Sequence, residues 1–223
     1  EASSRAAREA RRHPATATYD ACGEAWQVFD FDWTADTLRH RALPESADLP
    51  EPRRRSAETA KPGYPGRKRG DVQFCRAALQ HAGSALWTHI HLAPGNGDGQ
   101  EGLERALDSL VATAARVGFA RERCLVRMDG QFGHVPGLTA CRERGLPVLG
   151  RLNRASLLED PDVLHLLRTA TWQHAPDSGS GPTRFATELG DITLRPGKRT
   201  RRPDGSAYEP VRVRVVASVY RAT

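Results

Sequence analysis

The chain has few of the residues that cross-link a protein or anchor it in a membrane. Among its 223 residues are four cysteines and one methionine, and only 6% of the residues are aromatic. No apolar run approaches the length of a membrane span, so we expect no membrane partner. No two cysteines have the spacing of a metal clip, and their apolar neighbours predict reduced, buried thiols in a cytoplasmic protein. The four are Cys22, Cys75, Cys124 and Cys141.

The charge balance is basic. Lysine and arginine number 33 against 27 acidic residues, which gives a formal net charge of +6. Such an excess favours a polyanionic partner, because each phosphate that is neutralised releases counterions. The basic residues form runs, and we interpret the N-terminal one as a solvated face. The runs are Arg5, Arg8, Arg11 and Arg12; residues 53–55; residues 67–69; and Lys198, Arg199, Arg201 and Arg202.

Apolar periodicity predicts a mixed α/β fold. Residues 72–79 and 85–92 have strand character and are joined by a short turn, which predicts an antiparallel hairpin. Apolar residues then recur at three- and four-residue steps up to Gly118, which predicts a long helix. The other predicted strands are 26–32, 124–128, 147–152, 184–194 and 208–220, and the other predicted helices are 136–145 and 155–170.

The order of these elements predicts how the sheet is built. Three antiparallel strands followed by β-α-β-α units indicate a mixed sheet flanked by helices, the order of a ribonuclease-H-like core. Two aspartates follow strands that this order places side by side: Asp32 at or near the end of the first strand, and Asp129 directly after the fourth. Carboxylate oxygens are the ligands that Mg²⁺ prefers, so this pair is a candidate metal site.

Each aspartate also has an alternative interpretation. Asp129-Gly130 is a common turn dipeptide, and an aspartate after a strand is often a cap or turn residue. Asp30 shares a strand face with Asp32 and could replace it as a ligand.

Four motifs, in order and with the matching spacing, resemble insertion-sequence DDE transposases of bacteria. They cover about residues 26–155. The first is a strand followed by Asp-x-Thr, and the last is an apolar strand with Arg, then Asp and a small residue. The motifs are FDFDWT at 29–34 with RALP at 41–44, PGYPGRKRGD at 62–71, APGNGD at 93–98, and CLVRMDGQFG at 124–133.

The resemblance implies an enzyme that cleaves DNA strands at insertion-sequence ends and transfers them to a target. It implies Asp32 and Asp129 as the first two catalytic and metal-binding carboxylates, and Thr34 favours Asp32 over Asp30. The cofactor would be two Mg²⁺ ions about 3.5 to 4 Å apart, with Mn²⁺ as a substitute. The partner would be double-stranded DNA, with a homodimer when two ends are paired.

The family's third carboxylate, a glutamate on a helix after a β-rich insertion, has no counterpart that we can assign. Glu188 and Glu209 lie in strand or turn contexts. We therefore expect a basic N-terminal arm at 1–23, the first part of the core at 24–170, and a truncated insertion segment at 171–223. Because the chain begins at Glu1 and not at a methionine, we expect a fragment or a processed start.

The loop at 64–70 is a candidate DNA contact. Arg67, Lys68 and Arg69 lie between glycines, which suits contact with phosphates, and Tyr64 is available to stack on a base. Plain solvation of the loop is the alternative.

Other polar residues have weaker cases. His89 and His91 share a strand face, and we expect surface or packing roles for them before metal binding. His134 is interpreted as a polar residue at a helix start. For Arg127 we predict an ion pair or packing on the face opposite Asp129.

Two alternative functions share most of these features. One is a non-catalytic, DNA-binding remnant of a transposase, which lacks a working triad. The other is a metal-dependent nuclease of the same fold, which would not transfer strands. A basic scaffold protein would bind nucleic acid without divalent metal.

Overall fold

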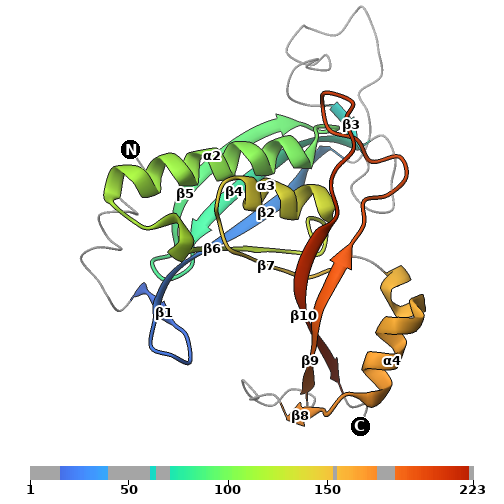
Figure 1. The fold of residues 1–223 in the computed structure, drawn as a ribbon. Coiled ribbons are helices and arrows are strands. Elements are labelled where there is room, and N and C mark those ends of the chain that lie inside the picture. Colours follow the sequence, from blue (N-terminus) through green and yellow to red (C-terminus); the bar gives the residue numbers. More distant parts are fainter. Residues whose placement is uncertain (1–15, 40–60, 64–70, 153–154, 175–183, 221–223) are drawn as a thin grey trace, which may run out of the picture. The chain divides into compact units, whose positions relative to one another are not determined.

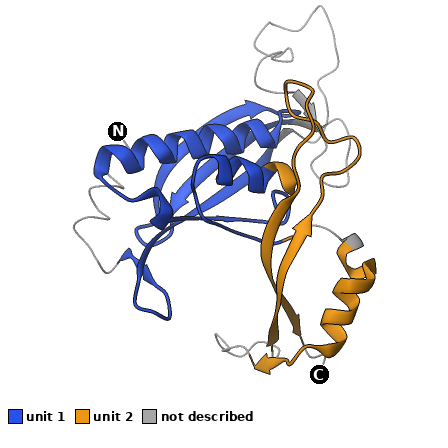
Figure 2. Cartoon of the chain, in the orientation of Figure 1, with its two compact units in different colours: residues 1–133, 137–151 blue, residues 134–136, 152–223 orange. Residues whose placement is uncertain are grey.

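The computed structural model describes five stretches of the chain, and they fall into two compact units. The stretches are residues 16–39, 61–63, 71–152, 155–174 and 184–220. Figure 2 colours the first unit, residues 1–133 and 137–151, and the second, residues 134–136 and 152–223. None of the described helices is long and apolar enough to cross a membrane.

The first unit is built on a mixed sheet whose five main strands have the order β5-β4-β2-β6-β7. Strands β2, β4 and β5 are antiparallel neighbours, whereas β6 and β7 continue the sheet in parallel. The short strand β1 (Thr18–Tyr19) pairs with β2, and β3 (Lys61–Gly63) pairs with β4. The main strands are β2 (Ala25–Arg39), β4 (Asp71–His81), β5 (Leu86–Pro94), β6 (Cys124–Met128) and β7 (Val148–Gly150).

Helix α2 (Gly99–Val117) covers one face of this sheet, and α3 (Val135–Glu143) lies on the same side (Figure 1). The side chain of Asp98 accepts a hydrogen bond from the backbone N–H of Gln100 and so caps the first turn of α2. At the other end Gly118 adopts φ 72°, a left-handed conformation that glycine tolerates without strain. The buried apolar residues of α2 include Leu103, Ala106, Leu107, Leu110 and Ala114.

The alternation of β2 decides which side chains face the helices. Phe29 and Phe31 are buried, and the ring of Phe31 meets that of Phe132 edge to face with centroids 4.9 Å apart. Trp33, two residues further, reaches α2 at Gly102, where a Cβ atom would overlap the indole ring. The residues between these aromatic ones face the opposite side of the sheet.

The strand that carries Asp32 is longer than the sequence predicts. It continues beyond Asp32 to Arg39, because β4 pairs with it along that whole length. Asp32 therefore lies inside β2 and not at its end, and this part of the prediction is wrong. The hairpin of β4 and β5, the helix ending at Gly118 and the strand Cys124–Met128 are confirmed.

The second unit contains a three-stranded antiparallel sheet in the order β10-β9-β8, together with α4. Strands β9 (Arg184–Leu194) and β10 (Val211–Tyr220) form a long hairpin, and β8 (Gln173–His174) pairs with β9. Helix α4 (Pro161–Thr169) follows the 3-10 helix η4 (Ala155–Glu159). Helix α4 belongs to the same unit as the C-terminal strands, although the sequence predicts it within the core segment 24–170.

Of the four cysteines, three are buried as predicted. Cys22 is exposed, because it lies in the turn between β1 and β2, where Asp20 accepts its backbone N–H. All four are free thiols. Burial raises the pKa of Cys124 and of Cys141 to about 12, so both are held as neutral thiols.

Candidate active site on the open face of the sheet

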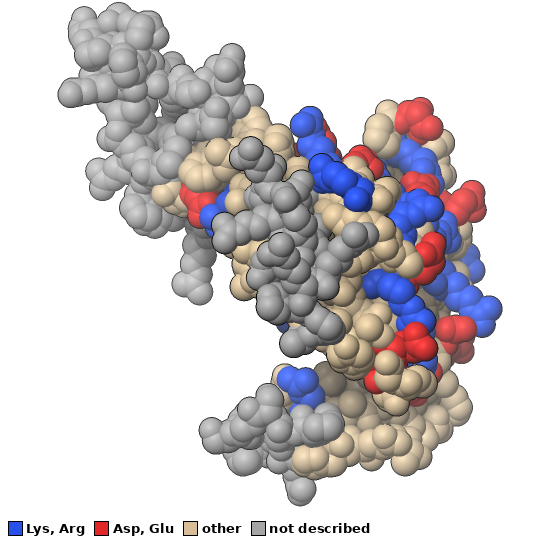
Figure 3. All heavy atoms as spheres, turned by 90° about the vertical axis from the view of Figure 1, so that its left-hand side faces the viewer, with Lys and Arg blue, Asp and Glu red and all other residues tan. Residues whose placement is uncertain are grey.

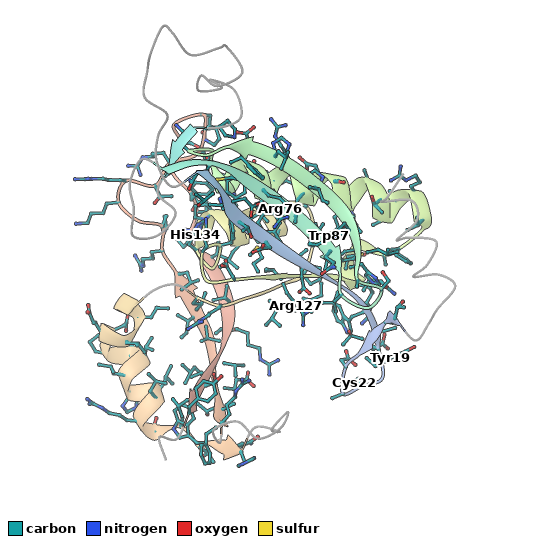
Figure 4. All side chains as sticks on the ribbon, turned by 180° about the vertical axis from the view of Figure 1, so that it is seen from behind. Tyr19, Cys22, Arg76, Trp87, Arg127 and His134 are labelled. Carbon is teal, nitrogen blue, oxygen red and sulfur yellow. The ribbon has the colours of Figure 1, made fainter. Side chains whose placement is uncertain are left out.

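Asp30 and Arg127 define the sheet face opposite α2. Their backbones are paired in register between β2 and β6. The guanidinium of Arg127 donates from Nε and Nη2 to the two carboxylate oxygens of Asp30, at 2.5 and 2.7 Å. Hydrogen bonding to Asp30 raises the pKa of Arg127. Figure 4 views this face, with Arg127, Arg76 and Trp87 labelled.

The same register ends directly before Asp32 and Asp129. The last pair between the two parallel strands is Phe31 with Met128, and both side chains are buried toward the helices. One residue further, Asp32 and Asp129 follow on neighbouring strands. Side chains alternate along a strand, so Asp32 is on the face of β2 that carries Asp30, whereas Asp129 begins the turn that follows β6. Two aspartates 97 positions apart in sequence are thus the residues that directly follow the last pair of two neighbouring parallel strands.

Hydrogen bonds hold one oxygen of each carboxylate. Thr34 lies on the same strand face as Asp32, and its hydroxyl donates to Oδ2 of Asp32. The backbone N–H of Gln131 donates to Oδ1 of Asp129 at 2.9 Å. Within the described part of the chain, the other oxygen of each carboxylate has no protein donor. Both residues are exposed, so these oxygens remain accessible.

Asp129 also has the turn role that the sequence left open. Its backbone carbonyl accepts the N–H of Phe132 at 3.3 Å, and that of Gly130 accepts Gly133. The side-chain bond to Gln131 completes this tight turn after β6. A turn fixes the direction of the carboxylate, so the two interpretations of Asp129 are compatible.

Asp30 differs from Asp32 in that Arg127 occupies both of its oxygens. This engagement favours Asp32 as the available ligand, on grounds independent of the motif. The ion pair predicted for Arg127 is confirmed. The face predicted for Arg127 relative to Asp129 stays a prediction, because Asp129 lies in the turn after β6.

The two carboxylates fit a hard divalent cation in part. Carboxylate oxygens are the ligands that Mg²⁺ requires, and each of the two leaves one oxygen without a donor among the described residues. Across the stretches that the structure describes, no group of three histidine, cysteine, aspartate or glutamate side chains could hold a metal ion. The described residues therefore supply two carboxylates, and a third ligand is not among them.

The histidines that the sequence offered as weaker candidates are His89, His91 and His134, and burial affects two of them. His89 and His91 share a strand face through their register with Leu79 and Ala77, and it is the face covered by α2. Their ring centroids are 6.4 Å apart, and burial is the main cause that lowers the pKa of His89. Burial also lowers the pKa of His134. The predicted packing role of His89 agrees with its half-buried position.

The candidate DNA contacts Tyr64, Arg67, Lys68 and Arg69 lie outside the described residues. Their role stays a prediction. The hydrogen bond from Thr34 to Asp32 was not predicted from the sequence, although the sequence contains a signal for it. The Asp-x-Thr spacing puts hydroxyl and carboxylate on one strand face, which is enough to expect a bond between them.

Comparison of the chain with models of known protein families finds no match, and comparison with curated proteins finds none either.

Proposed function

We propose that this chain carries catalytic-core residues of a DDE transposase with a ribonuclease-H-like fold. The observation that supports the proposal is the parallel register of β2 and β6, whose last pair, Phe31 with Met128, directly precedes Asp32 and Asp129. The strand order β5-β4-β2-β6-β7, antiparallel first and parallel afterwards, is the order expected of such a core. The β9–β10 hairpin is compatible with the expected β-rich insertion.

The activity proposed is metal-dependent cleavage of DNA strands at insertion-sequence ends, followed by strand transfer. Asp32 and Asp129 would hold the metal, with Mg²⁺ or Mn²⁺ as the ion. When bound, the metal ions would activate the attacking oxygen and stabilise the leaving oxygen of the phosphodiester. Thr34 and the N–H of Gln131 orient the two carboxylates, and each leaves one oxygen available.

Titration of the chain with Mn²⁺ tests the carboxylate pair directly. We expect Asp32→Asn and Asp129→Asn each to weaken Mn²⁺ binding at least about tenfold, because each removes one of two charged ligands. Asp36→Asn is the matched control. Asp36 lies on the same face of β2, four residues further, and pairs with Arg76 at 3.8 Å. Equal affinity in the wild type and both ligand variants would remove the basis of the proposal.

Strand cleavage gives the functional readout. Asp32→Asn or Asp129→Asn should abolish metal-dependent cleavage and leave DNA binding intact. Full cleavage by either variant would end the assignment. A nuclease of the same fold would cleave but would give no strand-transfer product with paired ends, which separates it from a transposase.

A non-catalytic DNA-binding remnant is the second candidate. It is favoured by one observation: within the described residues no group of three histidine, cysteine, aspartate or glutamate side chains could hold a metal ion. A remnant would bind DNA with an affinity that does not change when Mg²⁺ or Mn²⁺ is added.

A further inference from the structure

The loop between β9 and β10, residues 195–210, forms the tip of the long hairpin and is rich in positive charge. We call it the hairpin tip. It contains five basic residues and two acidic ones, Asp204 and Glu209. The basic residues are Arg195, Lys198, Arg199, Arg201 and Arg202.

The strands that carry the tip have their charges paired. Arg212 on β10 contacts Asp191 on β9 at 2.7 Å. Arg214 forms two hydrogen bonds with the carboxylate of Glu188, at 2.6 and 2.5 Å, and this contact lowers the pKa of Glu188. After these pairs the strands keep one excess cation, Arg184, whereas the tip has three more basic than acidic residues, so most of the net positive charge of the hairpin belongs to the tip.

Two of the tip arginines order the loop itself. The guanidinium of Arg201 donates to the backbone carbonyls of Lys198 and Thr200, both at 3.0 Å. That of Arg202 lies over the ring of Tyr208, 4.9 Å from its centroid, and Tyr208 is buried. These contacts order the backbone of the loop that carries the other basic residues, Arg195, Lys198 and Arg199.

Backbone turns add to this order, and Asp204 forms hydrogen bonds within one of them. Arg202 accepts the N–H of Gly205 and donates its own to the carbonyl of Ser206, both at 2.9 Å. Ser206 donates from its N–H and its hydroxyl to Asp204, and these bonds lower the pKa of Asp204. The carboxylate of Asp204 is thus directed into its own turn.

The other three cations, Arg195, Lys198 and Arg199, are exposed. In the described stretches no carboxylate lies within ion-pair distance of them. This differs from the molecular face in Figure 3, where basic and acidic side chains lie interspersed. Unneutralised cations on an ordered loop suit a polyanion, because binding releases counterions and the loop has little freedom to lose.

We propose that the hairpin tip binds the phosphate backbone of duplex DNA through Arg195, Lys198 and Arg199. The inference rests on the proposed function, since it takes DNA as the partner of the same protein. It adds a contact site in the second unit, separate from the carboxylate pair on the sheet. Duplex DNA fits better than a single strand because its phosphates are denser along the axis.

The test compares binding of a labelled 30-base-pair duplex at several salt concentrations, by fluorescence anisotropy. The variant is Arg195→Gln, Lys198→Gln and Arg199→Gln together. A plot of log affinity against log salt concentration has a negative slope. We expect the size of this slope to decrease by about 2 to 3 in the variant, near 0.9 for each phosphate that the variant no longer neutralises. The matched control changes the same number of charges on exposed helix positions, as Arg105→Gln, Arg142→Gln and Arg168→Gln. It should keep the wild-type slope apart from a small effect of net charge.

The outcomes separate this inference from the proposed function. If the wild type binds the duplex and the tip variant keeps the same slope, the inference is overturned while the metal test at Asp32 and Asp129 is unaffected. Equal losses of affinity in the tip variant and the control would also overturn it, because net charge alone would explain them. A wild type without salt-dependent binding to the duplex would remove DNA as partner of the tip. The substituted side chains are exposed, so thermal unfolding should match the wild type and exclude misfolding.

Discussion

At the scale of the residue, Thr34 and Asp32 act as one unit on the open sheet face. The hydroxyl of Thr34 holds Oδ2 of the carboxylate, so the direction of the free oxygen depends on this bond. Groups that orient a metal ligand commonly change metal affinity about 10- to 100-fold when they are removed. Thr34 is therefore a positioning residue in the proposed site.

We predict that Thr34→Val weakens Mn²⁺ binding by about tenfold, because valine keeps the shape of threonine but has no hydroxyl. Thr34→Ser should restore most of the affinity, since serine can donate the same bond. Titration of the three proteins with Mn²⁺ measures the effect. If valine and serine variants bind equally well, the Thr34 hydroxyl has no part in the site.

The residues of the site were predictable to different degrees. Asp129 follows directly after an apolar strand, a local signal, whereas Asp32 lies inside β2 and is singled out by the Asp-x-Thr spacing. The ion pair of Arg127 was also foreseen, but its partner Asp30 lies on another strand, and only the register β2–β6 reveals it. The bond from Gln131 to Asp129 depends on the turn geometry after β6, which the dipeptide Asp129-Gly130 indicates only in part.

At the scale of the element, periodicity predicted best where one face is buried. Helix α2 has apolar residues at regular steps and a clear end at Gly118, and the structure confirms both. The stretch predicted as one helix at 155–170 is instead η4 and α4. Asp160 caps α4 by accepting the N–H groups of Asp162 and Val163, and Pro161 begins it. An Asp-Pro pair is a helix start that the prediction overlooked.

The end of β2 was missed for a different reason. Residues 33–39 contain few apolar side chains in alternation, so local pattern gives little strand signal there. The strand continues because β4 pairs with it as far as Arg39, which is a tertiary effect.

The contact between α2 and the sheet gives a prediction at this scale. A Cβ atom at Gly102 would overlap the ring of Trp33, and both positions are fixed by the helix and the strand. We expect Gly102→Ala to lower the free energy of unfolding by about 1 to 3 kcal/mol, as overpacking does, although alanine is the better helix former. Urea denaturation measures this change.

The double variant Gly102→Ala with Trp33→Leu serves as the control. Leucine removes the ring that the new methyl group meets, so the second substitution should cost less in the alanine background than alone. If the loss of stability in the double variant equals the sum of the losses in the two single variants, the methyl group and the ring do not compete for space.

At the scale of the whole molecule, burial lowers the pKa of several histidines and so favours their neutral form. His81 is 1% exposed, and its ring nitrogens contact Ser84 and Gln27 at 2.8 Å each. Desolvation lowers the pKa of His81 from 6.5, and burial lowers those of His89 and His134 as well. The folded chain therefore resists protonation at positions where the unfolded chain accepts it.

The sign of the pH dependence follows from this difference. Below about pH 6.5 the unfolded state binds more protons than the folded state, so stability is present above that pH and is lost as pH falls. Each such proton contributes up to about 1.4 kcal/mol per pH unit. The carboxylates with lowered pKa values, Asp20, Glu188 and Asp204, lose their contribution only below their ordinary values near 4, outside this window.

We predict that the free energy of unfolding falls between about pH 7.5 and pH 5, and that His81→Gln reduces the slope by up to one proton. Glutamine keeps donor and acceptor groups for Ser84 and Gln27 but does not titrate. Urea denaturation at a series of pH values gives both slopes, and the slope is compared because the substitution also changes absolute stability. If the variant and the wild type lose stability in parallel, the proton that opposes folding does not bind at His81.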